Sequence, residues 1–249
     1  MLKKLGAALA ALTLAGCAAT YVTPAAGVRA EALQKADDDI AEVLRREPTA
    51  SFPARIAIAR VETSRYSTPG AECFGRGRMC VVIGHDVETD QDFERIADLP
   101  GVAGAVPIGR MLLPEQIDSI KDLRLGAASL KADLLLAYSF DTRFHVEGTE
   151  IGPLELVSLG LLPHKKAHVT VTASAALFDV RTGFVYGTAE GLATEEQRAN
   201  LWSTGQAIED SRITAERKAF QDLLKDLPRL WKGILAEYGL KAARDQEKH

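Results

Sequence analysis

The chain has 249 residues, of which 47% are hydrophobic and 26% are charged, and its formal net charge at neutral pH is −4. These values are typical of a globular protein with a sizeable core and exclude a disordered chain. A mildly acidic chain without a basic run also lacks the clustered cations with which proteins bind nucleic acids, so no nucleic-acid partner is expected.

The N-terminal residues 1–16 have the layout of a secretory signal peptide. Two lysines precede an apolar stretch, Leu5 to Leu14, which is too short for a permanent membrane-spanning helix. The sequence LAGC that follows resembles the lipobox of bacterial lipoproteins, with Cys17 as the acceptor. The resemblance implies cleavage before Cys17 and its acylation with several chains, which anchor a protein durably to a bilayer. An ordinary signal peptide with a chance cysteine is the alternative.

The residues after Cys17 indicate where such a lipoprotein would reside. They are Ala18 and Ala19, and neither is the Asp that retains lipoproteins at the inner membrane of enteric-type bacteria. We therefore expect a lipid-anchored protein of the outer membrane that faces the periplasm. The expected organisation is a signal peptide, a lipidated tether, one periplasmic domain and a charged tail, over residues 1–16, 17–28, 29–240 and 241–249.

Cys73 and Cys80 are the two remaining cysteines. In an exported chain an even pair is usually a disulfide, and the intervening residues, FGRGRM, would close a short loop. In the chain-entropy model such a loop adds about 2 to 3 kcal/mol of stability. A metal site with His85 as the third ligand is the alternative, although the spacing matches no familiar zinc site.

Apolar residues at intervals of three and four predict four helices, over residues 29–47, 90–99, 115–131 and 211–238. Pro48 closes the first helix, and Asp90 is expected to cap the second. Pro228 is expected to kink the last helix, and Trp231 lies on its apolar stripe and should be in the core.

Apolar runs and alternating patterns predict six strands, at residues 52–62, 80–84, 101–108, 134–146, 168–179 and 184–194. The first is apolar on both faces, which favours a place inside the sheet. The last two form a hairpin around Gly183. Residues 64–79 are expected to be a loop and residues 147–166 an insertion.

The order of these elements predicts an α/β (α+β) fold. Helices between strands imply parallel pairing by crossover, and the hairpin adds antiparallel strands. We therefore expect a mixed β-sheet covered by helices, with an antiparallel hairpin near the C-terminus and a long C-terminal helix.

Four segments carry a resemblance to a known family: ARIAIARVE, AASLKADLLLAYSF, FDVRTGFVYG and the closing helix. Together they resemble the periplasmic α/β domain of the lipoprotein family around the curli secretion subunit CsgG, and the N-terminal domain of TolB. The pore-forming members insert hairpins with strands of about 10 residues each. Because residues 147–166 are too short for two such strands, a lipid-anchored accessory or assembly factor is favoured over a secretion pore.

No motif of a hydrolase, a zinc protease or a phosphate-binding loop is present. Asp141 and His145 lie on the same face of a predicted strand, with Arg143 between them, and offer a polar site. Alternating polar residues are, however, more often the solvated face of a sheet. We therefore expect no catalytic activity, no cofactor and no metal.

The insertion has an apolar centre, LELVSLGLLP. Packed inward it would plug the core; exposed, it would need a partner or a membrane to cover it. Trp202 lies in a polar stretch, where it either pins a loop or makes an exposed contact. The candidate contact residues are therefore Leu154, Leu156, Val157, Leu159, Leu161, Leu162 and Trp202.

These features predict a non-enzymatic lipoprotein of the outer membrane that binds another envelope protein, or itself, as an assembly factor. One alternative is an oligomeric subunit of an export apparatus. The other is a small hydrolase or ligand binder that uses the polar strand face near Asp141 and His145.

Overall fold

The computed structural model describes residues 20–22, 40–68, 70–84, 86–148, 165–198 and 205–239. Its strands are β1 (Thr20–Val22), β2 (Ala54–Thr63), β3 (Glu72–Phe74), β4 (Arg76–Gly77), β5 (Met79–Ile83), β6 (Val102–Pro107), β7 (Gln116–Ile117), β8 (Leu134–Gly148), β9 (Lys165–Asp179) and β10 (Val185–Arg198). Its helices are α2 (Ile40–Arg45), α3 (Asp90–Ala97), a 3₁₀ turn (Arg110–Leu112), α4 (Ile120–Ser129), α6 (Gly205–Ile234) and a π-helical turn (Leu235–Gly239).

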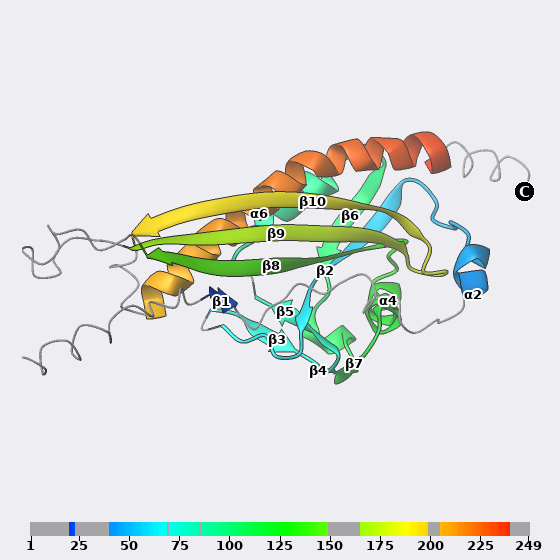
Figure 1. The fold of residues 1–249 in the computed structure, drawn as a ribbon. Coiled ribbons are helices and arrows are strands. Elements are labelled where there is room, and N and C mark those ends of the chain that lie inside the picture. The colour runs from blue at the N-terminus through cyan, green and yellow to red at the C-terminus, as the bar shows by residue number, and fades with distance from the viewer. Residues whose placement is uncertain are drawn as a thin grey trace, which may run out of the picture.

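Eight of these strands form one mixed sheet (Figure 1). Its order is β10-β9-β8-β2-β5-β3, with β6 also paired to β2 and β1 to β8. Strand β2 runs parallel to β6 and β8 but antiparallel to β5, while β8, β9 and β10 are antiparallel to one another. The expected fold class is therefore confirmed, including the hairpin and the long last helix.

The sheet is buried on both faces near β2, because helices cover each side. Ile56 and Ile58 of β2 pack in the core that contains α3 and α6. Ala57 and Ala59, which point the other way, pack in a second core with α4. This arrangement explains why β2 carries apolar residues on both faces, and it confirms the expected position of β2 inside the sheet.

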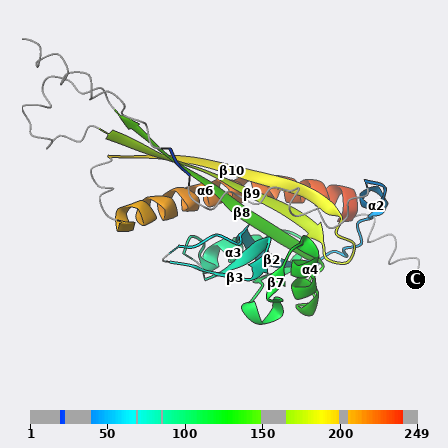
Figure 2. The same cartoon turned by 60° about the horizontal axis from the view of Figure 1, so that its bottom comes forward.

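Strands β8 and β9 are much longer than the strands of the body. They pair without a register shift from Leu134↔Asp179 to Gly148↔Lys165. Figure 2 shows β8, β9 and β10 running together past the remaining strands. One part of β8 therefore belongs to the body, whereas the rest extends beyond it.

Helix α6 crosses this extension at unusually small residues. A Cβ atom at Gly191 of β10 would lie 2.3 Å from both the Ala219 oxygen and the Leu223 nitrogen of α6. Ala215 and Ala219 of α6 are fully buried. The helix can approach β10 this closely only because neither surface carries a larger side chain.

Several element boundaries differ from those expected. Thr20–Val22, expected in the tether, is strand β1, and the expected loop 64–79 contains β3 and β4. The ends of the expected insertion 147–166 belong to β8 and β9, because the pairing continues to Gly148 and Lys165. Residues 29–39 of the first expected helix and residues 149–164 lie outside the described residues.

Capping boxes explain one wrong cap and one wrong helix start: α3 begins at Asp90 as expected but has another cap, and α4 begins at Ile120 rather than at residue 115. Thr89, rather than Asp90, caps α3 through reciprocal hydrogen bonds with Asp92. Ser119 caps α4 in the same way, so the residues before it are free to form β7. Helix α6 continues unbroken through Pro228 to Ile234, and the expected kink there remains a prediction.

No helix among the described residues is both long enough and apolar enough to cross a membrane.

Candidate functional site

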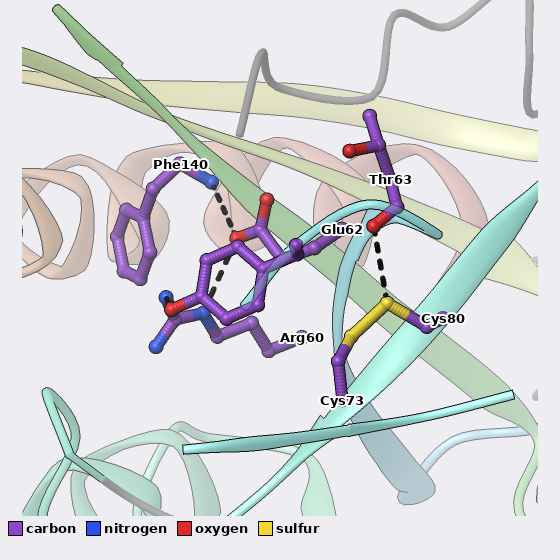
Figure 3. The surroundings of a disulfide bond; sticks show 7 residues. Arg60, Glu62, Thr63, Cys73, Cys80 and Phe140 are labelled. Carbon is purple, nitrogen blue, oxygen red and sulfur yellow. Dashed lines mark hydrogen bonds and ion pairs between the residues drawn. A yellow bond between two sulfur atoms is a disulfide. The ribbon is translucent and has the colours of Figure 1, made fainter. Parts of the chain in front are cut away.

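The most unusual feature of the described chain is an arginine buried in the sheet. Arg60 of β2 is only 3% exposed. Its Nε donates to Glu62 at 3.3 Å, its Nη1 to Asp86 at 2.8 Å, and its Nη2 to the Tyr66 hydroxyl at 2.8 Å. The guanidinium also lies 4.6 Å from the centre of the Phe140 ring (Figure 3). Such a cation is held by hydrogen bonds and by the ring face at the same time.

Helix α6 supplies the other half of this cluster. Arg212 pairs with Asp86 and with Glu216, and donates to Glu209 at 2.7 Å. Glu216 accepts a hydrogen bond from Arg60 at 3.3 Å and another from Thr142 of β8 at 2.8 Å. The cluster thus joins β2, β8, α6 and the segment between β5 and α3.

We call this group the Arg60 cluster. Among the described residues it contains two guanidinium groups, five carboxyl groups and two phenols, those of Arg60, Arg212, Glu62, Asp86, Glu88, Glu209, Glu216, Tyr66 and Tyr138. The carboxyl groups outnumber the cations, so full ionisation would leave a net negative charge inside the protein. Such a charge is costly unless a proton or another cation offsets it.

Burial and the two arginines shift the pKa values of the cluster in different directions. Burial raises the pKa of Glu62 to about 8, against the opposing effect of Arg60. Burial also raises the pKa of Glu216. Burial disfavours the charged form of Asp86 as well, yet Arg60 and Arg212 bring its pKa below the usual value. Arg60 stays charged because Glu88, Glu216 and Glu62 raise its pKa despite burial.

Two buried oxygen atoms in the cluster lack a hydrogen-bond partner among the described residues: Oε2 of Glu62 and Oε2 of Glu88. The raised pKa of Glu62 favours the protonated form of its carboxyl group. Glu88 instead lines a cavity of about 120 Å³, together with Arg60 and Tyr138. The cluster is therefore a buried polar core, and one of its residues, Glu88, also lines a cavity.

Cys73 and Cys80 form a disulfide bond with a Cα–Cα distance of 5.5 Å, which is the pairing expected from the sequence. It links β3 to β5, and the Cys80 sulfur lies 3.2 Å from the carbonyl oxygen of Thr63, at the end of β2 (Figure 3). Because both sulfurs are in the disulfide, they are not available as metal ligands. His85 lies outside the described residues, and no group of metal-ligating residues occurs within them.

The polar strand face singled out from the sequence carries an ion pair. Arg143 and Asp141 form an ion pair at 3.0 Å, with side chains 68% and 32% exposed. The backbone of His145 pairs with that of His168 in β9. Trp231 is 3% exposed and donates to the Pro100 oxygen at 2.7 Å, which confirms its place in the core.

The other sequence-derived candidates lie outside the described residues. They are Cys17, Leu154, Leu156, Val157, Leu159, Leu161, Leu162 and Trp202.

The sequence analysis missed the Arg60 cluster. The available signal was a pair of charged residues, Arg60 and Glu62, inside a strand whose other residues are almost all apolar. A second signal was that Arg212 and Glu216 are four residues apart on α6, so that both lie on one helical face. Nothing in the sequence indicated that these two pairs meet.

No family model and no curated protein matches the sequence. Among solved structures, the PelC dodecamer from Paraburkholderia phytofirmans is 13% identical with a TM-score of 0.31, covering 72% of this chain and 92% of that one. A DUF330 protein from Xanthomonas campestris is 12% identical with a TM-score of 0.33, covering 82% and 92%. These similarities are distant, and the functional argument rests on the chain's own residues.

We predict that Glu62→Gln makes the stability of the protein less dependent on pH. A carboxyl whose pKa is raised from 4.5 to about 8 by folding stabilises the protein most below pH 4.5, and this stabilisation is lost as the pH rises towards 8. Each pKa unit corresponds to about 1.4 kcal/mol, so the loss is a few kcal/mol at most. Urea unfolding of both proteins across this range should show that the free energy of unfolding of the variant, relative to that of the wild type, increases as the pH rises. Parallel stability curves would contradict the assignment.

Proposed function

We propose that this chain is a lipoprotein of the bacterial outer membrane that faces the periplasm and acts by binding another envelope protein. The lipobox-like sequence ending at Cys17 supports the anchor. The Cys73–Cys80 disulfide agrees with an oxidising compartment. The element order that resembles the CsgG and TolB domains supports an envelope role for the folded body.

The observation that carries the proposal is the register of β1. Thr20 pairs with His145 and Val22 with Arg143, so β1 runs antiparallel to β8. Moving backward along the chain from Thr20 therefore leads towards the Gly148 end of β8. Cys17 is three residues before Thr20, a distance that chain geometry limits to about 10 Å. A lipid on Cys17 would accordingly hold this end of the sheet at the membrane.

The apolar candidates are connected to the same end. Residues 149–164, which include the Leu-rich sequence, join Gly148 to Lys165, and these two residues pair with each other. Residues 199–204, which include Trp202, follow Arg198, whose partner in β9 is Lys166. Lysines and an arginine thus flank both segments at the end of the sheet that we assign to the bilayer, where they suit anionic lipid headgroups.

A surface for a protein partner is available at the opposite end. Helix α2 leads to Thr49, whose backbone and side chain donate to Asp179 where β9 ends. Ile40 and Leu44 of α2 are 77% and 79% exposed. Both residues belong to the apolar pattern from which a helix over residues 29–47 was predicted. An exposed apolar helix face suits a second protein, either another envelope protein or another copy of this chain.

The Arg60 cluster supports binding rather than catalysis. Arg60, Glu62 and Glu216 are each at most 3% exposed. Their hydrogen bonds are formed with one another and with neighbouring groups such as the Phe140 backbone and the Thr142 hydroxyl. Asp141 and Arg143 neutralise each other on an exposed strand face. Neither group has the nucleophile, base and oxyanion donor that a hydrolase requires around one open position.

We predict that Cys17→Ser abolishes lipidation. Cells given labelled palmitate should label the wild type and a Cys73→Ser/Cys80→Ser control, in which Cys17 is intact, but not Cys17→Ser. The unlabelled variant should also leave the membrane fraction, because the lipid is its anchor. Equal labelling of all three proteins would contradict the assignment of Cys17 as the lipidated residue.

We also predict that the exposed face of α2 contacts a protein. A photocrosslinking residue at Leu44 should yield a defined adduct in intact cells, and the same residue at Glu190, on the exposed part of β10, should not. An adduct with another envelope protein or with a second copy supports the proposal. No adduct, or equal adducts from both positions, overturns this docking surface.

A further inference from the structure

The cavity beside the Arg60 cluster has the composition of a binding site. Its volume is about 120 Å³, room for about four water-sized groups. Apolar side chains form much of its wall, including Ile58 of β2, Val81 of β5, Phe93 of α3 and Ile108. Glu88 is also among the residues that line this space.

Glu88 is buried but incompletely paired. It is 3% exposed, and its Oε1 accepts a hydrogen bond from the Tyr138 hydroxyl at 2.8 Å. Its Oε2 has no hydrogen-bond partner among the described residues. A buried acceptor without a donor is costly, and native proteins rarely leave one unsatisfied. A donor is therefore expected from outside the described chain.

Arg60 does not meet this need. Its closest approach to Glu88 is 3.6 Å, from Nη1 to Oε1. Its donors are directed at Glu62, Asp86, Tyr66 and Glu216. Oε2 of Glu88 is therefore left without a hydrogen-bond donor among the described residues, and Glu88 is one of the residues that line the cavity.

We propose that this cavity binds a small primary alkylammonium group. The ammonium donates to Oε2 of Glu88, and its short carbon chain lies against Ile58, Val81, Phe93 and Ile108. The same chemistry belongs to a free short-chain amine and to the end of a lysine side chain. The bound cation supplies the donor that Oε2 of Glu88 lacks. It also offsets the negative charge of the cluster, in which carboxyl groups outnumber the guanidinium groups. This site does not depend on the lipid anchor.

The test is calorimetric titration of the purified full-length chain with n-propylammonium. Glu88→Gln keeps the side-chain shape but removes the charge, and should weaken binding at least about tenfold. Neutral n-propanol and tetramethylammonium, which has no N–H donor, should not bind. N-acetyl-lysine amide is titrated in parallel. Tighter binding of this compound assigns the site to a lysine side chain, and tighter binding of n-propylammonium assigns it to a free amine.

A second variant keeps the test independent of Glu88. Gly109 is an exposed residue that lines the cavity. Its φ of −80° is accessible to any residue, and a Cβ atom there would meet nothing within 4 Å. Gly109→Leu should fold and obstruct the cavity, and so reduce binding. Gly233→Leu, at an exposed and open position on α6, is the matched control and should bind as the wild type does. No saturable binding to the wild type, or wild-type affinity in both Glu88→Gln and Gly109→Leu, overturns the proposal.

Discussion

The pairing of β8 is the constraint on which the rest of the structure depends. Over 15 residues, or about 50 Å, β8 holds one register with β9. On its other edge it pairs first with β2, from Leu134 to Tyr138, and then with β1, from Arg143 to His145. A shift of one residue would turn every side chain of β8 to the opposite face, so the apolar core fixes this register. It thereby also fixes which end of the sheet lies beside the N-terminal segment.

The Arg60 cluster lies where β8 leaves the body. Tyr138, Phe140 and Thr142 alternate with outward-facing residues and point to the same side as α6. Arg60 stacks on one of these side chains, and Glu216 accepts a hydrogen bond from another. Buried ion pairs contribute little net stability, but an unmatched charge is strongly unfavourable. The main effect of the cluster is therefore to disfavour other arrangements of β2, β8 and α6, in which its charges would be unpaired. Its net contribution to the free energy of unfolding is small.

Much of the fold was predictable because its elements follow local rules. The alternation of Val169, Val171 and Ala173 with threonines identified β9, and the turn at Gly183 identified its partner β10. Strand β2 was predictable from its apolar faces. The cap of α3 and the start of α4 were missed because the side chains of Thr89 and Ser119 form capping boxes that the apolar pattern does not reveal.

The candidate sites were less predictable because they depend on long-range contacts. Arg60 and Glu216 are 156 positions apart, and only tertiary packing brings them together. The pairing of Thr20 with His145 similarly connects a segment interpreted as a tether to the far end of β8. Charged residues within an apolar strand gave a local hint of a buried network. No local pattern could identify its partners or the cavity beside Glu88.

The most direct test of the account is the orientation of the body on a bilayer. Single cysteines introduced at Glu196, near the Gly148 end of the sheet, and at Arg181, in the turn between β9 and β10, carry a fluorophore in the lipidated protein on vesicles. Lipid-borne quenchers should quench the label at position 196 much more than the label at position 181. Equal quenching, or stronger quenching at position 181, would contradict the claim that this end of the sheet faces the membrane.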